Sequence, residues 1–175
     1  MTHDTETAPM LSSRYPVLTA ILLGGLIAGT VDIGAASLIG MVSPLAVTRA
    51  IASGLIGKAV HGGGLPVSFL GLLLQWAMGM LIAAIYMLAT AVMPGMRRRW
   101  IPTGIVAGVI IYFVMVYLVL PFSAAPFRQA FDLQVFIKDF ALDGDFVKNM
   151  LAMMLFGLIV GFCARDVPGV NPARD

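Results

Sequence analysis

Four long runs of apolar residues dominate the chain, and short polar stretches separate them. The runs extend over Val17–Met41, Leu65–Met93, Ile101–Leu120 and Phe146–Cys163. A helix of about 20 apolar residues crosses a hydrocarbon core of about 30 Å. Because each run is close to or above that length, and because a helix satisfies its backbone polar groups internally, the pattern predicts four transmembrane helices.

The segment between the first two runs has the pattern of an amphipathic helix lying on the membrane surface. Ser43 is a suitable N-cap, Pro44 fits the first turn, and Gly62–Gly64 end the helix. At about 100° per residue, one face collects Leu45, Ile51, Ala52, Leu55 and Ile56. The opposite face collects Ala50, Ser53, Gly54, Gly57 and His61. Arg49 and Lys58 fall at the edges, where long cationic side chains reach lipid headgroups.

A second surface helix is predicted between the third and fourth runs. Its apolar positions follow i, i+3, i+4, i+7 spacing and are Leu133, Phe136, Ile137 and Phe140. Asp132 is the expected cap and Gly144 the expected end. The carboxylates that follow, Asp139, Asp143 and Asp145, lack the ligand spacing of a calcium loop, so we interpret them as solvated charges.

The order of these elements repeats, and so do their glycines. GLIAG at positions 25–29 returns as GIVAG at positions 104–108, a shift of 79. An arginine stands 20 residues after the last glycine of each motif, Arg49 in the first case and Arg128 in the second. We expect both arginines to lie at the lipid interface, as part of the surface helix or just before it.

The repeat predicts how the chain is divided. Gly79 is matched by Gly157 at a shift of 78, so two tandem repeats cover about 17–93 and about 101–163. Each consists of a transmembrane helix, an interfacial amphipathic helix and a second transmembrane helix. The prediction is an all-α polytopic membrane protein with one domain at 17–166, an N-terminal tail at 1–16 and a C-terminal tail at 167–175.

Three of the runs carry glycines four positions apart. These residues are Gly25, Gly29, Gly104, Gly108, Gly157 and Gly161. Such a spacing places both glycines on one helix face and lets another backbone approach closely. We interpret the six glycines as helix-packing positions, whether the contacts form within one chain or between chains.

Asp32 is the one charged residue well inside a run. A carboxylate at this depth costs about 3 kcal/mol on insertion scales, so it is expected to face another helix. Gln75 lies at a similar depth on the second run, with Tyr112 and Thr30 as further candidate partners. Two interpretations stay open: a proton-carrying or substrate-binding group, or an interhelical hydrogen bond. The repeat equivalent of Asp32 is Ile111.

Composition excludes several functional classes. The chain is 59% hydrophobic and 11% charged, against about 25% charged in soluble domains. A net charge of +2 without a basic and aromatic groove argues against nucleic-acid binding. The single Cys163 excludes a multi-cysteine metal or cluster site, and we predict neither metal nor cofactor. The runs contain no GxSxG or HExxH motif, so the sequence favours a protein that is not an enzyme.

Basic residues predict the orientation in the membrane. Arg97, Arg98 and Arg99 stand in the loop between the second and third runs, and basic short loops stay in the cytoplasm. Four crossings put both termini on that side as well. The three arginines, together with Lys58 and His61 in the last turn of the first surface helix, are candidate contacts to lipids or to a partner.

Three stretches carry a resemblance to a set of small bacterial inner-membrane proteins without assigned activity, and more distantly to the YagU-like family. They are GGLIAGTVDIGAAS, LQWAMGMLIAAIY and IYFVMVYLVLPFSAAP, within residues 20–165. The resemblance implies a protein with four crossings in the bacterial inner membrane, and no catalytic residue. We therefore expect a non-enzymatic structural or accessory subunit or homo-oligomer among membrane lipids, with a small transporter or proton- or cation-conducting protein using Asp32 as the alternative.

Overall fold

The computed structural model describes residues 16–57, 64–119, 122, 144–165 and 167, and these residues form helices without any strand. Four helices are long and apolar enough to cross a membrane. They are α1 (Pro16–Gly40), α3 (Gly64–Val92), α5 (Trp100–Val114) with its π-helical continuation η2 (Met115–Val119), and α8 (Gly144–Ala164). Each of the four predicted apolar helices is confirmed, and its ends lie within one residue of the apolar stretches found, which run over 16–40, 64–92, 100–119 and 146–164.

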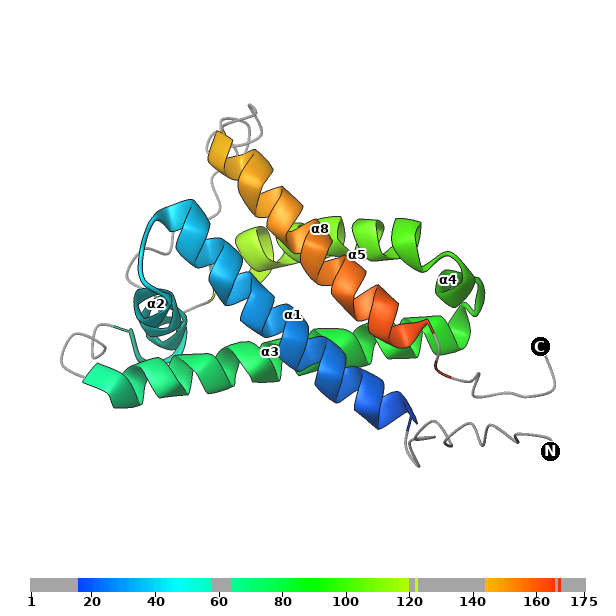
Figure 1. Ribbon diagram of the computed structural model, residues 1–175, viewed down its shortest axis with the longest axis horizontal. Helices are drawn as coiled ribbons and strands as arrows, with labels where there is room; N and C mark the ends of the chain where they lie inside the picture. The colour runs from blue at the N-terminus through cyan, green and yellow to red at the C-terminus, as the bar shows by residue number, and fades with distance from the viewer. Residues whose placement is uncertain (1–15, 58–63, 120–121, 123–143, 166, 168–175) are drawn as a thin grey trace, which may run out of the picture.

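The four long helices pack in the order α3, α1, α8, α5. Close contacts join α3 to α1, α1 to α8 and α8 to α5, whereas α3 and α8 touch only slightly. The short helix α4 (Gly95–Arg98) connects α3 to α5. Figure 1 shows α4, the start of α1 and the end of α8 toward one end of the molecule, with α2 toward the other. An even number of long helices that alternate in direction explains this arrangement.

Glycines bring α1 and α3 into backbone contact. A Cβ atom added to Gly79 would lie 2.5 Å from the carbonyl oxygen of Gly25, and one added to Gly25 would lie 2.5 Å from the Cα of Met80. No side chain fits in that space. Van der Waals contact at this distance favours helix association in lipid, where burial of apolar surface gives little advantage.

A second set of glycines joins α5 and α8 in the same way. A Cβ atom on Gly104 would lie 2.9 Å from the carbonyl oxygen of Gly157, and one on Gly157 would overlap the oxygen of Gly104. Gly108 faces the backbone of Met153 and Met154 with equally little space. These two helices therefore depend on glycine as much as α1 and α3 do.

The predicted surface helix is present as α2 (Pro44–Ile56), with Ser43 as its N-cap. The hydroxyl of Ser43 accepts a hydrogen bond from the backbone N–H of Ala46 at 3.3 Å. The helix is capped by Gly57, whose φ of 66° favours glycine, rather than ending at 62–64 as predicted. Gly64 already belongs to α3.

The inward face of α2 differs from the predicted apolar face. Thr48, Ala52 and Ser53 are its buried residues, and the Thr48 carbonyl packs onto Gly71 of α3. Ser53, which the sequence groups on the face opposite the apolar one, is buried, and its hydroxyl donates to the Ala50 carbonyl. The larger apolar side chains are turned outward: Leu45, Leu55 and Ile56.

We expect the glycine contacts to tolerate no added methyl group. Gly108→Ala should lower the free energy of unfolding by about 1–3 kcal/mol, because a new Cβ would overlap the carbonyl of Met153. Gly34→Ala is the matched control, since nothing lies within 4 Å of a Cβ at that position of α1. Denaturation of both purified variants in mild detergent measures the difference. Equal stability of the two would show that the α5 and α8 backbones are not in contact.

Candidate intramembrane polar site

Asp32 and Gln75 form a hydrogen bond between α1 and α3. The Gln75 side-chain amide donates from Nε2 to Oδ2 of Asp32 at 2.7 Å. Gln75 is 9% exposed and Asp32 is partly buried. The structure thus brings together two polar residues that the sequence places at one depth, and it turns the carboxylate toward a neighbouring helix as its cost in hydrocarbon requires.

A second polar link lies beside the first one. The Trp76 indole donates from Nε1 to the hydroxyl oxygen of Thr30 at 3.0 Å, and that hydroxyl donates to the Leu26 carbonyl at 2.7 Å. Sequence reasoning considered Thr30 only as a partner for Asp32 and missed Trp76. The sequence does contain a sign of this contact, because Thr30 is two positions from Asp32 and Trp76 is next to Gln75.

Tyr112, a candidate partner of Asp32 in the sequence, lies in an aromatic contact. Its ring is 8% exposed and packs edge-on against Phe113 and Phe146, with centroid distances of 5.7 Å and 5.5 Å. The tyrosine therefore belongs to an aromatic contact between α5 and α8, on the other side of the bundle from the α1–α3 pair.

All six of the helix-packing glycines face another helix of the same chain. Added Cβ atoms would lie 3.3 Å from the Gln75 carbonyl oxygen for Gly29 and 3.0 Å from the Trp100 carbonyl oxygen for Gly161. Gly161 also faces the Tyr86 hydroxyl, which shares a hydrogen bond of 3.0 Å with Thr103 and so links α3 to α5. The sequence left open whether such contacts form within or between chains, and in this structure they are internal.

The α5–α8 contact lacks a carboxylate at the place where α1–α3 has one. Gly29 faces Gln75, whereas Gly108 faces Met153, and Ile111 stands in α5 where Asp32 stands in α1. Close helix contact is achieved in both places. The Asp32–Gln75 hydrogen bond is thus not required for this type of helix crossing.

The predicted basic residues lie partly within the described structure. Arg97 donates from Nη1 to the Val167 carbonyl at 2.9 Å, whereas Arg98 and Arg99 are exposed. Arg49 is exposed on α2 and donates from Nε to the Leu45 carbonyl at 3.2 Å. Lys58, His61, Arg128 and the predicted helix over 132–143 lie outside the described residues.

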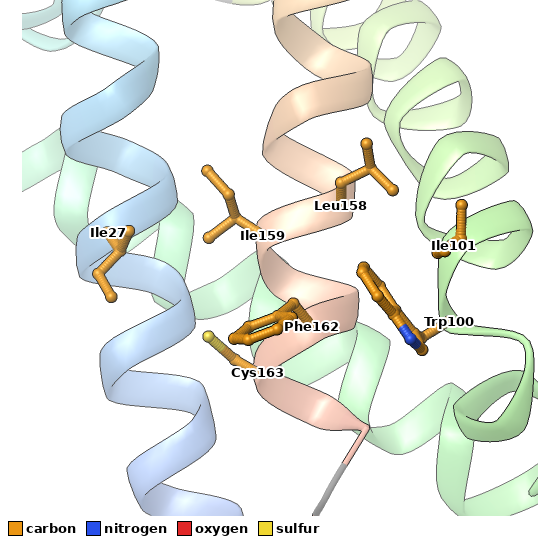
Figure 2. Close-up of a pocket in the computed structure, with 7 residues that line it drawn as sticks. All are labelled: Ile27, Trp100, Ile101, Leu158, Ile159, Phe162 and Cys163. Carbon is orange, nitrogen blue, oxygen red and sulfur yellow. The ribbon is translucent and has the colours of Figure 1, made fainter.

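An apolar groove of about 480 Å³ runs along α8 near the end that carries α4. Its walls include Ile27 of α1, Trp100 and Ile101 of α5, and Leu158, Ile159 and Phe162 of α8. Figure 2 shows Ile159 on the side of α8 that faces α1 and Leu158 on the side that faces α5. Cys163 also lines the groove, and sequence reasoning did not anticipate the groove because its walls come from three distant segments.

Within the described residues, no group of three His, Cys, Asp or Glu side chains is placed to hold a metal ion. Comparisons with known proteins give no match to a family model, to a curated protein or to a solved structure.

The link between Asp32 and Gln75 predicts a measurable coupling. In a double-mutant cycle with Asp32→Leu and Gln75→Leu, we expect a coupling energy of about 0.6–1.7 kcal/mol, because either single change leaves a polar group unpaired in hydrocarbon. Unfolding in detergent supplies the four stabilities. Strictly additive effects would mean that the carboxylate and the amide do not interact.

Proposed function

We propose that the chain is a non-enzymatic integral protein of the bacterial inner membrane with a structural or accessory role. In this view it is a rigid helical unit that associates with a second copy or with a larger membrane complex. The observation that carries the proposal is that the glycine faces and the Asp32–Gln75 hydrogen bond hold the helices of the chain to one another. These contacts fold the unit, so a partner must meet its outer surface.

The outer surface of α3 is suited to such a partner or to lipid. Large apolar side chains stand out from it along its whole length: Leu65, Phe69, Leu73, Leu81, Ile85 and Leu88. Exposed apolar side chains are expected of any helix in hydrocarbon, and they pack equally well against lipid or another apolar helix. An association through this face therefore differs from the glycine-mediated contact that the sequence alone suggested.

We also infer that the two helix pairs descend from one tandem repeat. The contacts of Gly25 with Met80 and of Gly29 with Gln75 correspond to those of Gly104 with Leu158 and of Gly108 with Met153. Each correspondence follows the shifts of 78 or 79 positions found in the sequence. Equivalent contacts at equivalent positions support a duplicated pair of helices, with α1–α3 and α5–α8 as the copies.

The alternative is a small transporter or a proton- or cation-conducting protein that uses Asp32. One observation favours it: the described residues supply a donor to Oδ2 of Asp32 but none to Oδ1. The insertion cost of about 3 kcal/mol also exceeds the gain of about 0.6–1.7 kcal/mol from one such hydrogen bond. A second function for the carboxylate would explain why it stands here.

Asp32→Asn separates the two proposals. Asparagine keeps the size and an acceptor oxygen but does not ionise. For the structural role, we expect normal folded yield and the same native mass in mild detergent, at a multiple of 18.6 kDa or in a defined complex, for both variant and wild type. Growth of cells that depend on the protein should also be unchanged.

Two outcomes of this experiment would count against the structural role. Normal yield and mass with loss of growth or ion flux would favour the carboxylate as a working group. A wild-type protein that is monomeric and carries no partner at native mass would remove the accessory assembly. Asp32→Leu serves as the control for folding, since it leaves Gln75 unpaired and should lower the yield.

The proposed orientation places α4 and both termini in the cytoplasm. In a Cys163→Ala background, Gly95→Cys and Gly144→Cys should react with an impermeant thiol reagent from opposite sides. Both positions have nothing within 4 Å of an added Cβ, so neither change should disturb packing. Labelling of Gly95→Cys in intact cells, without permeabilisation, would reverse the orientation.

A further inference from the structure

The apolar groove along α8 has an aromatic wall close to the membrane boundary. Trp100, the first residue of α5, and Phe162, in the last turn of α8, contact each other edge-on at a centroid distance of 5.6 Å and an interplanar angle of 75°. Figure 2 shows the Trp100 ring between α8 and α5 and the Phe162 ring on α8, with Ile159 further along α8 and Ile27 on α1. The groove is open to the outside of the bundle, which in a membrane is hydrocarbon.

A cation stands at the mouth of this groove. The guanidinium carbon of Arg165 lies 4.0 Å from the centroid of the Phe162 ring and 5.8 Å from that of Trp100. Both distances are within the range of a cation–π contact. Phe162 thus serves as a wall of the groove and as the support that holds the charge of Arg165 beside it.

Most of the charged residues near the mouth are arginines, although Asp166 directly follows Arg165 in the sequence. Arg98 and Arg99 are exposed just before Trp100, and Arg97 lies beside them in α4. None of the described residues of α4 or of the last turn of α8 is acidic. A row of cations above an apolar groove complements an anionic headgroup joined to an acyl chain.

The distances along α8 also fit an anionic headgroup joined to an acyl chain. Leu158 lies seven residues before Arg165, which corresponds to about 10 Å along a helix. A phosphate near Arg165 would place the first several carbons of its acyl chain against Phe162, Ile159 and Ile27. The membrane supplies such a molecule at high local concentration, whereas a helix from another protein would have to cover the charged Arg165.

We propose that this groove, with Arg165 at its mouth, is a binding site for one anionic phospholipid. The Arg165 guanidinium contacts the phosphate, and an acyl chain occupies the groove between α1, α8 and α5. Arg98 and Arg99 contribute positive potential, which attracts the headgroup without fixing its position. The site does not depend on Asp32 or on the oligomeric state.

Quenching of Trp100 by brominated phospholipids tests the site directly. Trp76→Phe leaves Trp100 as the single tryptophan, because the chain contains two. In vesicles that mix plain phosphatidylcholine with brominated lipid, we expect half-maximal quenching at an about fivefold lower fraction of brominated phosphatidylglycerol than of brominated phosphatidylcholine. High salt should reduce this preference for phosphatidylglycerol over phosphatidylcholine, since it screens exposed charges.

Substitutions at the mouth locate the effect. Arg165→Gln should make the half-maximal fractions of the two brominated lipids nearly equal, so that their ratio is close to one. Arg165→Lys should keep most of the difference, and Arg49→Gln on α2 should leave it unchanged. The converse single-tryptophan protein, Trp100→Phe, reports from Trp76, which does not line the groove, and should show no preference.

Three results would overturn the proposal. They are a ratio near one with Arg165 intact, a preference that survives Arg165→Gln, and a lack of quenching by either lipid, which would mean that protein covers the groove. If Arg165→Gln does not fold, the ratio measured with Arg165 intact and its loss at high salt still decide the question.

Discussion

The close approach of backbones at glycine is the interaction on which the rest of this structure depends. Lipid tails are as apolar as leucine, so helices in a membrane associate through van der Waals contact and hydrogen bonds rather than through burial alone. The carbonyl oxygen of Gly25 lies where a side chain on Gly79 would have to be, and Gly104 and Gly157 are related in the same way. Because the helices are held this closely, their other side chains are also brought to fixed positions. Gln75 reaches Asp32 because α1 and α3 already touch at Gly25, which lies about two turns from Asp32 along α1.

Properties that belong to a single segment could be predicted from the sequence. Hydropathy and length predicted four helices able to cross a membrane, and residue spacing predicted the glycine faces. A rise of 1.5 Å per residue placed Asp32 and Gln75 at a similar depth. Properties that depend on contacts between segments could not. The packing of α1 against α8 as well as α3, the burial of Ser53, and the groove between three helices follow from distant partners. The end of α2 at Gly57 was also missed, since any of several glycines could have stopped the helix.

The two helix pairs solve the same packing problem with different chemistry. At α5–α8 the glycines suffice, and Ile111 and Met153 stand where the first pair has polar side chains. At α1–α3 an aspartate has been added, although its insertion cost of about 3 kcal/mol is larger than one hydrogen bond returns. Stability therefore does not explain the aspartate. Two explanations stand. The polar pair selects α3, rather than α5 or α8, as the helix that packs on that face of α1, or the carboxylate has a function apart from helix packing. A buried polar pair as a means of specifying partners is well attested in helical assemblies.

The closeness of packing also explains where the groove lies. Within each pair, added Cβ atoms would come within 2.5–2.9 Å of the facing backbone, as at Gly79 and Gly104. Between the pairs, a Cβ atom added to Gly24 of α1 would lie 3.4 Å from the Cβ of Cys163, which is an ordinary van der Waals distance. The contact between α1 and α8 thus includes side chains where the other two contacts are backbone against backbone. Three side chains of this boundary, Ile27, Ile159 and Cys163, line the groove. A lipid or a partner that enters the groove would therefore contact side chains of the α1–α8 boundary rather than the glycine backbones within a pair.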